Sequence, residues 1–312
     1  MLQSFNPQNA DLQYSVNGRL YHRDEPGVSP FDSVVQGGDA VWEGLRVYDG
    51  RIFKLREHLD RLTHSAKALG FADIPTHDRI IDDIRRTLTA NAMRDGVHIR
   101  LTLTRGVKIT SGMDPRLNTA GQTLIVLAEH KPPVYDTSAG LRLITASIRR
   151  PSPDVLDPKI HHNNLLNSIL AKMEASAAGA DDAVMLDSRG FVAETNATHL
   201  FLVTRDPHAP QAPGASPVVH TPRCIACPEG ITRAVVLQLC GELSIPAVER
   251  DLSLAEFHRA DECFCTGTMG EIAWIREIDG RTIGPGTPGP ITQRLQHAFR
   301  DLTQSSGERI VD

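Results

Sequence analysis

Alternating apolar and polar residues mark two short paired segments near the start of the chain. Residues 14–21 alternate around Asn17-Gly18, and residues 45–53 alternate around Asp49-Gly50. Asn-Gly and Asp-Gly favour the left-handed backbone conformation that tight hairpin turns require. The pattern therefore predicts a β-hairpin in each segment.

Between residues 55 and 92 the apolar residues recur every three or four positions, which is the spacing of one helix face. This spacing runs from Leu55 to Leu69, where Gly70 is a typical helix stop, and again over residues 76–92. Residues 97–105 and 122–128 alternate or run apolar, so they are predicted to be strands.

Pro132 and Pro133, followed by polar residues, interrupt this pattern and are typical of a linker between domains. We therefore expect a small N-terminal domain over residues 1–132, a linker over 133–138 and a larger domain over 139–312. In the larger domain the pattern predicts strands at 141–148, 183–186, 191–194, 200–204 and 262–267, and helices at 164–179 and 230–243.

Composition excludes several classes of protein. The 312 residues are 40% hydrophobic and 23% charged, which is typical of a soluble globular protein. The formal net charge is −5 with no basic run, so we expect neither a nucleic-acid partner nor a membrane-surface partner. No apolar run is long enough for a membrane span, and the first residues lack the pattern of a secretory signal. We expect a cytoplasmic protein.

Five cysteines in a chain without an export signal argue against a disulfide framework. Cys224 and Cys227 match C-x-x-C, which can serve redox chemistry or bind zinc. Cys263 and Cys265 alternate along a predicted strand, whereas zinc sites draw their cysteine pairs from turns. The favoured interpretation is buried thiols and no metal site, with a regulatory thiol pair or zinc as the alternatives at Cys224 and Cys227.

Lys159, after Asp157-Pro158, and Glu194 are the pair that a pyridoxal phosphate (PLP) site needs. The lysine amine forms a Schiff base with the cofactor aldehyde, and a carboxylate keeps the pyridine nitrogen protonated so that the ring accepts electrons. A lysine in such a loop is more often a solvated residue, so this hypothesis depends on the other motifs along the chain.

Those motifs, taken in order, resemble the class IV aminotransferases, the fold-type IV PLP enzymes that include branched-chain and D-amino-acid aminotransferases. The matching blocks are residues 38–46, 56–62, 157–164, 192–195, 230–233 and 266–272. The resemblance spans about residues 14–299. It implies an α/β (α+β) fold of two domains, the larger with a pseudo-barrel, and a homodimer in which loop 106–118 is the candidate contribution to the neighbouring site.

The resemblance implies roles for individual residues. Lys159 is both the Schiff-base lysine and the general acid/base, and Glu194 pairs with the pyridine nitrogen. The cofactor phosphate is bound by Arg61, by the backbone N–H groups of Ile231 and Thr232, where a helix begins, and by Thr268. Without the motifs, Thr232 is better interpreted as an N-cap.

The substrate residues that the resemblance implies are Trp42 in the side-chain pocket, and Arg100, Thr268 and Met269 at the α-carboxylate. D-amino-acid enzymes use an Arg-x-His pair, which the sequence after Arg105 lacks. This difference favours L-amino acids.

The chain departs from the family pattern in several places. Asn164 stands where branched-chain enzymes have tyrosine, Gly37 and His98 replace tyrosines, and His199 stands at the asparagine of Glu-Gly-x-x-x-Asn. These changes remove aromatic hydroxyls from the expected substrate cavity. The paired residues 161 and 162 are both histidines for which the sequence gives no role, and we expect them in a loop.

The function that the resemblance implies is transfer of the amino group of an L-amino acid, with an apolar or branched side chain, to 2-oxoglutarate. The alternatives are a D-amino-acid or amine aminotransferase, a PLP lyase of the aminodeoxychorismate type, and a non-catalytic protein with the PLP fold. The joint presence of Lys159, Glu194 and Arg61 argues against the last of these.

Overall fold

The computed structural model describes residues 4–135, 138–204 and 217–312, which fall into two compact units. The smaller unit holds residues 4–132, 160–164 and 303–312, and the larger holds residues 133–159 and 165–302. Two segments of the expected larger domain, 160–164 and 303–312, thus belong to the smaller unit. Residues 136 and 137 of the expected linker lie outside the described residues.

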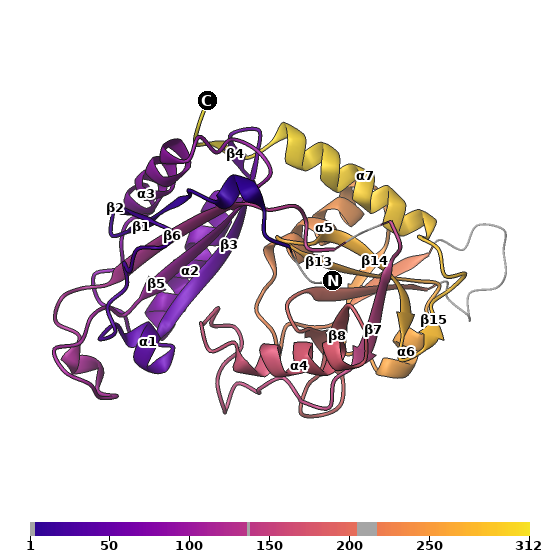
Figure 1. Ribbon diagram of the computed structural model, residues 1–312. Helices are drawn as coiled ribbons and strands as arrows, with labels where there is room; N and C mark the ends of the chain where they lie inside the picture. Colours follow the sequence, from indigo (N-terminus) through magenta and orange to yellow (C-terminus); the bar gives the residue numbers. More distant parts are fainter. Residues whose placement is uncertain (1–3, 136–137, 205–216) are drawn as a thin grey trace. The chain divides into compact units, whose positions relative to one another are not determined.

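Among the described residues, the smaller unit contains a seven-stranded sheet in the order β16-β4-β3-β5-β6-β1-β2 (Figure 1). Its strands are β1 (Gln13–Val16), β2 (Arg19–His22), β3 (Ala40–Tyr48), β4 (Arg51–Ile52), β5 (Val97–Thr104), β6 (Thr123–His130) and β16 (Glu308–Arg309). Its helices are α1 (Ser33–Gly37), α2 (Leu55–Ala68) and α3 (His77–Ala90), with short 3-10 turns at Pro7–Asn9 and Pro115–Leu117.

Helices α2 and α3 pack on this sheet through their apolar faces (Figure 1). Leu59 and Leu62 of α2 and Ile84 of α3 are fully buried in one core with Ile99 of β5. Burying a side chain of this size stabilises the fold by about 1.5–3 kcal/mol, so the amphipathic spacing is the main reason for the position of both helices.

Both predicted hairpins are confirmed, and their turn residues take the backbone conformation expected. Asn17 and Gly18 have φ values of 51° and 81°, and Asp49 and Gly50 have 44° and 73°. β1 pairs with β2 and β3 with β4, both antiparallel. A Cβ at Gly50 would also lie 2.3 Å from the Val311 carbonyl oxygen, so this turn accepts only glycine.

Residues 160–164 attach to the free edge of β3. The Trp42 N–H donates to the His161 carbonyl at 3.0 Å, and the Asn163 N–H donates to the Ala40 carbonyl at 2.9 Å. These bonds explain why the residues after Lys159 belong to the smaller unit.

The larger unit contains, within the part of the chain that is described, a nine-stranded sheet in the order β12-β11-β10-β13-β14-β7-β8-β9, with β15 beside β14. The strands are β7 (Leu141–Thr145), β8 (Asp182–Leu186), β9 (Val192–Thr195), β10 (His199–Thr204), β11 (Val218–Thr221), β12 (Ala247–Glu249), β13 (Glu262–Gly267), β14 (Glu271–Ile278) and β15 (Arg281–Thr282). The Thr195 N–H donates to the Thr198 carbonyl at 2.8 Å in the turn from β9 to β10, so the sheet curls back on itself.

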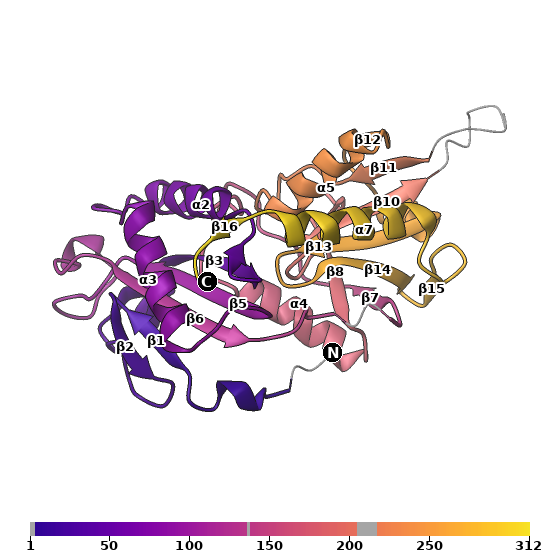
Figure 2. The ribbon, with the colours of Figure 1, turned by 90° about the horizontal axis from the view of Figure 1, so that it is seen from above.

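Four helices are described in this part of the chain: α4 (Leu166–Ala177), α5 (Ile231–Glu242), α6 (Leu254–His258) and α7 (Pro290–Ser305). Helix α4 packs on β8 through Ala171 and Ala175. Helices α5 and α7 lie side by side (Figure 1 and Figure 2), and Arg294 of α7 donates to the Leu243 carbonyl at the end of α5. The mixed α/β class with a curled sheet in the larger unit is therefore confirmed.

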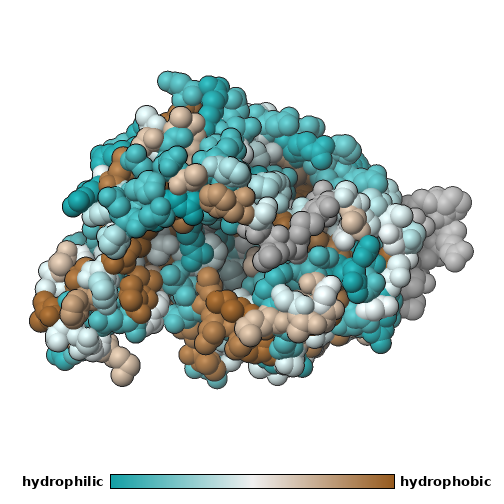
Figure 3. All heavy atoms as spheres, in the orientation of Figure 1, coloured by the Kyte–Doolittle hydropathy of each residue, from teal (hydrophilic) through white to brown (hydrophobic). Residues whose placement is uncertain are grey.

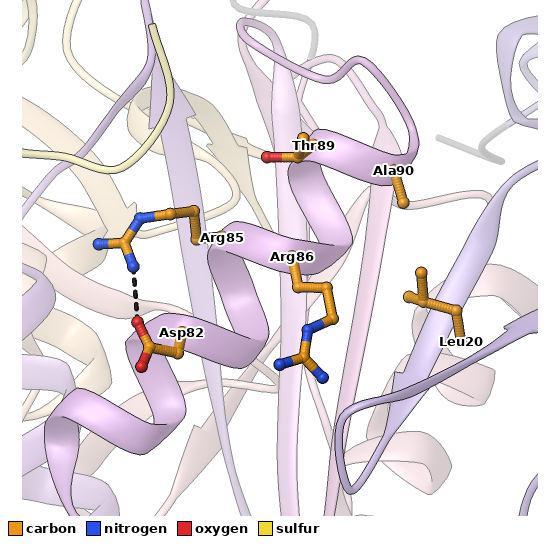
Figure 4. A pocket seen from close by; sticks show the side chains of 6 residues that line it. All are labelled: Leu20, Asp82, Arg85, Arg86, Thr89 and Ala90. Atoms are coloured by element: carbon orange, nitrogen blue, oxygen red, sulfur yellow. Dashed lines mark hydrogen bonds and ion pairs between the residues drawn. The ribbon is translucent and has the colours of Figure 1, made fainter.

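No helix in the described part of the chain has the length and apolar character needed to cross a bilayer. A pocket of about 490 Å³ opens on the smaller unit beside α3. It is lined by Leu20, Asp82, Arg85, Arg86, Thr89 and Ala90 (Figure 4). Arg85 pairs with Asp82 at 2.6 Å and Arg86 donates to the Gly18 carbonyl at 2.6 Å, so both guanidinium groups already have partners. No residue of the sequence motifs lines this pocket.

Candidate active site

Lys159 lies on an exposed loop of the larger unit, immediately before the segment that joins β3. Its Nζ lies 3.0 Å from Glu229 Oε1, and its side chain is 53% exposed. The hydrogen bond and the charge of Glu229 raise the pKa of the Lys159 amine above its ordinary value. A nucleophilic amine must be neutral, so this arrangement differs from the lowered pKa that PLP chemistry requires.

Glu194 is a buried carboxylate on β9, and Arg150 is its ionic partner. Arg150 Nη2 lies 2.8 Å from Glu194 Oε1, with side-chain exposures of 11% and 5%. Arg150 also donates to the Ala226 carbonyl and to Ser168 Oγ, each at 3.1 Å. Buried charged groups are stable when paired, and Arg150 supplies this partner and holds the Glu194 carboxylate in place.

Helix α5 begins at Ile231 with Gly230 as its N-cap residue, and no side chain caps this end. Thr232 is therefore the second helical residue and not the N-cap. The first backbone N–H groups of a helix lack internal partners and attract anions. The backbone N–H groups of Ile231 and Thr232 lie at this uncapped helix start, and their role at the phosphate stays a prediction.

The turn between β13 and β14 contains Thr268 and Met269, both partly exposed. The Gly270 N–H donates to the Gly267 carbonyl at 3.2 Å and closes this turn. Just before it, Thr266 is fully buried, and its Oγ1 has no hydrogen-bond partner among the residues that the structure describes. An orphaned hydroxyl beside an uncapped helix is uncommon unless a polar ligand completes the site.

Cys224 and Cys227 lie in the loop between β11 and α5. Cys227 is fully buried, whereas Cys224 is partly exposed. A hydrogen bond from Cys227 lowers the pKa of Cys224, and the same bond together with burial raises the pKa of Cys227. The charge of Glu194 acts on both thiols, and Cys224 in turn acts on Lys159. The cysteine pair therefore lies in the electrostatic neighbourhood of both predicted PLP residues.

In the smaller unit, Arg61 of α2 is bound to Glu43, which is fully buried on β3. Arg61 Nε and Nη2 donate to the two oxygens of Glu43 at 2.8 and 2.7 Å, and His58 Nδ1 lies 2.6 Å from the same carboxylate. Burial raises the pKa of Glu43, but Arg61 and His161 outweigh it and hold the pKa well below its ordinary value. Arg61 is thus held by a buried carboxylate that orients its guanidinium.

Trp42 and Arg100 lie on neighbouring strands with the segment after Lys159 beside them. The Arg100 Cζ lies 3.5 Å from the Trp42 ring centroid, and Arg100 donates to Asn163 Oδ1 at 2.7 Å. The His161 ring stacks on Trp42 at 4.3 Å and contacts Glu43 at 3.1 Å. Burial lowers the pKa of Arg100 to about 10, so it remains charged at neutral pH.

Of the nine residues predicted for the site, six lie in the larger unit and three in the smaller. The larger unit holds Lys159, Glu194, Ile231, Thr232, Thr268 and Met269, and the smaller holds Trp42, Arg61 and Arg100. Sequence reasoning missed Arg150, Glu229, Glu43 and His161. Glu43 and His161 lie inside blocks of sequence that match the family, so their position could have marked them as site residues. No local pattern marks Arg150 as the partner of Glu194 or Glu229 as the partner of Lys159.

Comparison with known proteins identifies the family. The sequence model of Amino-transferase class IV matches residues 40–278. "Branched-chain-amino-acid aminotransferase-like protein 2" of Arabidopsis thaliana is 55% identical over 96% of this chain, but the chain spans only 52% of that protein. "Putative branched-chain-amino-acid aminotransferase" of Methanocaldococcus jannaschii is 41% identical over 96% of this chain and 100% of its own length.

Solved structures agree with these relatives. The branched-chain aminotransferase of the archaeon Thermoproteus uzoniensis, solved with norvaline, superposes with a TM-score of 0.83 at 29% identity, covering 94% of this chain and 95% of its own. The enzyme of Thermobaculum terrenum in its PLP form gives a TM-score of 0.80 at 27% identity, covering 95% of each. With the curled sheet, the ordered motifs and the family match over most of its length, this chain belongs to the class IV aminotransferases.

Proposed function

We propose that this chain is a PLP-dependent aminotransferase that moves the amino group of an L-amino acid, with an apolar or branched side chain, to 2-oxoglutarate. The observation that carries the proposal is the Arg150–Glu194 ion pair, which holds a buried carboxylate in the same unit as Lys159. The names of the relatives and of the solved structures support the substrate class.

The residues of the larger unit fit PLP. The uncapped start of α5 offers backbone N–H groups to a phosphate. The Thr266 hydroxyl, unpaired among the described residues, can bond to a polar group of the cofactor. The Glu194 carboxylate can pair with a protonated ring nitrogen. When bound, PLP supplies an aldehyde carbon for covalent attachment to an amine and a ring that accepts electrons. Arg61 and Thr268 are our further candidates for the phosphate.

Lys159 is the proposed proton carrier. Its amine must lose a proton and leave Glu229 before it can attach to the cofactor. With PLP bound, Lys159 would supply the amine that holds the cofactor, and its Nζ would be the group that accepts and returns the proton of the substrate α-carbon. Arg150 would hold the Glu194 carboxylate in position.

Trp42 and Arg100 are the proposed substrate contacts of the smaller unit, together with the turn at Thr268 and Met269. Trp42 offers an aromatic face to an apolar side chain, and Arg100 is a charged donor suited to a carboxylate. Arg105, the arginine nearest to the D-amino-acid motif, is already bound to Asp39 at 2.6 Å and to the Leu69 carbonyl at 2.8 Å. This supports the preference for L-amino acids.

The test uses purified protein with bound PLP, offered L-leucine or D-alanine with 2-oxoglutarate. The proposal predicts glutamate and the branched 2-oxo acid from L-leucine, and no activity in Lys159→Ala. Conversion of D-alanine without L-leucine would favour a D-amino-acid aminotransferase, a class to which the 32% identical D-alanine aminotransferase of Bacillus licheniformis belongs by name. Pyruvate release without an acceptor would indicate a lyase.

The proposal includes a homodimer, for which two exposed apolar regions provide support. Leu166, Ile169, Leu170 and Met173 form a stripe along α4 with exposures of 66, 51, 39 and 60%. Figure 3 shows apolar surface where Figure 1 draws this helix. Ile109 and Met113, in the loop proposed to complete the neighbouring site, are 69 and 99% exposed. Contiguous apolar surface of this kind marks an interface.

Light scattering after gel filtration tests the dimer. We expect twice the 34.1 kDa chain mass for the wild type and a shift toward the monomer for Ile169→Lys with Met173→Lys. A monomeric wild type at micromolar concentration would contradict the dimer without affecting the proposed reaction.

A further inference from the structure

Three metal-ligating side chains from separate parts of the sequence meet in the larger unit. A ring nitrogen of His199 and the Sγ atoms of Cys224 and Cys227 all lie within 4.8 Å of one another. His199 begins β10, whereas the cysteines lie in the loop before α5. The proposed aminotransferase reaction uses none of the three.

The sequence did not favour a metal at Cys224 and Cys227, because the second cysteine pair, Cys263 and Cys265, lies on a strand and not in a turn. The structure adds a third ligating side chain, His199. His199 is also one of the positions at which this chain departs from the family pattern, since asparagine is usual there. A histidine that departs from the family pattern therefore has a ring nitrogen within 4.8 Å of both cysteine sulfurs.

The local structure holds these side chains in place. A Cβ at Gly230 would lie 2.2 Å from His199 Cδ2 and 2.3 Å from Nε2, so the imidazole packs directly against a position that accepts only glycine. Arg150 donates to the Ala226 carbonyl at 3.1 Å, between the two cysteines. Cys227 is fully buried and His199 is 7% exposed.

Two thiolates and one imidazole form a donor set that zinc prefers. Tetrahedral zinc holds its sulfur ligands about 2.3 Å away, which places ligand atoms about 3.8 Å apart. Atoms already within 4.8 Å need to close by only about 1 Å to reach that geometry. Cys224 is partly exposed, which gives an ion access.

We propose that His199, Cys224 and Cys227 bind one Zn²⁺ ion through two sulfurs and one ring nitrogen, with the fourth position open to water. Binding displaces the two thiol protons to solvent, and no electron is transferred. The ion would lie in the electrostatic neighbourhood of Glu194, whose charge acts on both cysteines.

A disulfide between Cys224 and Cys227 is the competing use of the same pair. It requires an oxidant and gives no role to His199. The histidine therefore distinguishes the two, because its removal should abolish tight zinc binding but leave disulfide formation intact.

The experiment uses the full chain with bound PLP, freshly reduced and dialysed against micromolar Zn²⁺ without free cofactor. Elemental analysis gives the zinc retained per chain, and competition with a chromophoric chelator gives its affinity. The variants are Cys224→Ser, Cys227→Ser and His199→Asn, the last of which restores the family residue. Cys240→Ser, a buried thiol on α5, is the matched control.

We expect one tightly held zinc per chain in the wild type and in Cys240→Ser, and an affinity lowered by more than about 100-fold in each ligand variant. Circular dichroism and the cofactor absorbance of each variant establish that it is folded. The proposal is overturned if the reduced wild type retains no zinc, if His199→Asn binds as tightly as the wild type, or if the pair only forms a disulfide.

Discussion

Arg150 donates to Glu194 across 2.8 Å at a depth where neither side chain is more than 11% exposed. This ion pair holds in place the carboxylate that the proposed chemistry needs. It links residues that are far apart in the sequence, and it connects Glu194 to the cysteine loop through the Ala226 carbonyl.

Replacing Arg150 should therefore damage both the fold and cofactor binding. Arg150→Met leaves a buried carboxylate without its partner, so we expect a loss of about 3 kcal/mol in the free energy of unfolding, measured by urea denaturation. Cofactor affinity should fall as well, because Arg150 no longer holds the Glu194 carboxylate in place. Arg149→Met is the matched control, and equal stability of the two variants would contradict this account.

Glu229→Gln should alter the pH dependence of cofactor capture. Glu229 raises the pKa of the Lys159 amine, so the amine of the wild type stays protonated to a higher pH. Removing that charge lowers the pKa and increases the neutral, reactive fraction near pH 8. We expect the rate at which apoprotein takes up PLP, followed by absorbance, to shift its pH profile toward lower pH. Glu242→Gln should not shift the profile, and an unmoved profile in Glu229→Gln would show that the ion pair does not control Lys159.

Glu43→Gln tests the buried cluster around Arg61. The pKa of Glu43 is lowered in the folded protein. The stabilisation that this carboxylate contributes is therefore complete at pH values above its pKa in the unfolded chain, about 4.5, and it is lost as the pH falls toward its pKa in the folded protein. At pH 7 we expect the variant to lose about 3 kcal/mol of stability. Its urea midpoint should also change less than that of the wild type between pH 7 and pH 4. A parallel pH dependence of the two proteins would exclude Glu43 as the titrating group, and Glu57→Gln, on the exposed face of α2, serves as the control.

Arg100→Met tests the proposed carboxylate contact. A charge-assisted hydrogen bond contributes about 1.5–3 kcal/mol, so kcat/KM for the amino acid should fall by about 10–100-fold, mainly through KM. Steady-state kinetics with L-leucine measures this change. Arg85→Met, in the pocket beside α3, should behave as the wild type, and an unchanged KM in Arg100→Met would remove Arg100 from the substrate site.

The sequence predicts best those elements that short-range chemistry determines. The turns at Asn17-Gly18 and Asp49-Gly50 need a left-handed backbone, and α2 ends near Gly70, whose φ is 67°. The start of α5 at Ile231 follows from Gly230 as its N-cap. Each of these can be read from a few neighbouring residues.

Features that depend on distant partners could not be predicted in this way. The segment after Lys159 joins β3 because a free strand edge is available there, and no periodicity in that segment indicates it. β7 ends at Thr145 and not at residue 148. Beyond Thr145, the Ala146 and Arg150 N–H groups donate single hydrogen bonds to the Val184 and Leu186 carbonyls, and these bonds do not continue the regular pairing of two strands. The Glu229 partner of Lys159 and the proximity of Cys224 to His199 likewise exist only in the folded chain.

The central claim is that Lys159 carries the cofactor. Borohydride reduction of the PLP-loaded protein, followed by protease digestion and mass spectrometry, locates the attachment directly. The account predicts one phosphopyridoxyl group per chain, on the peptide that contains Lys159, and none in Lys159→Ala. A label on Lys172 or any other lysine, or no label at all, would contradict it.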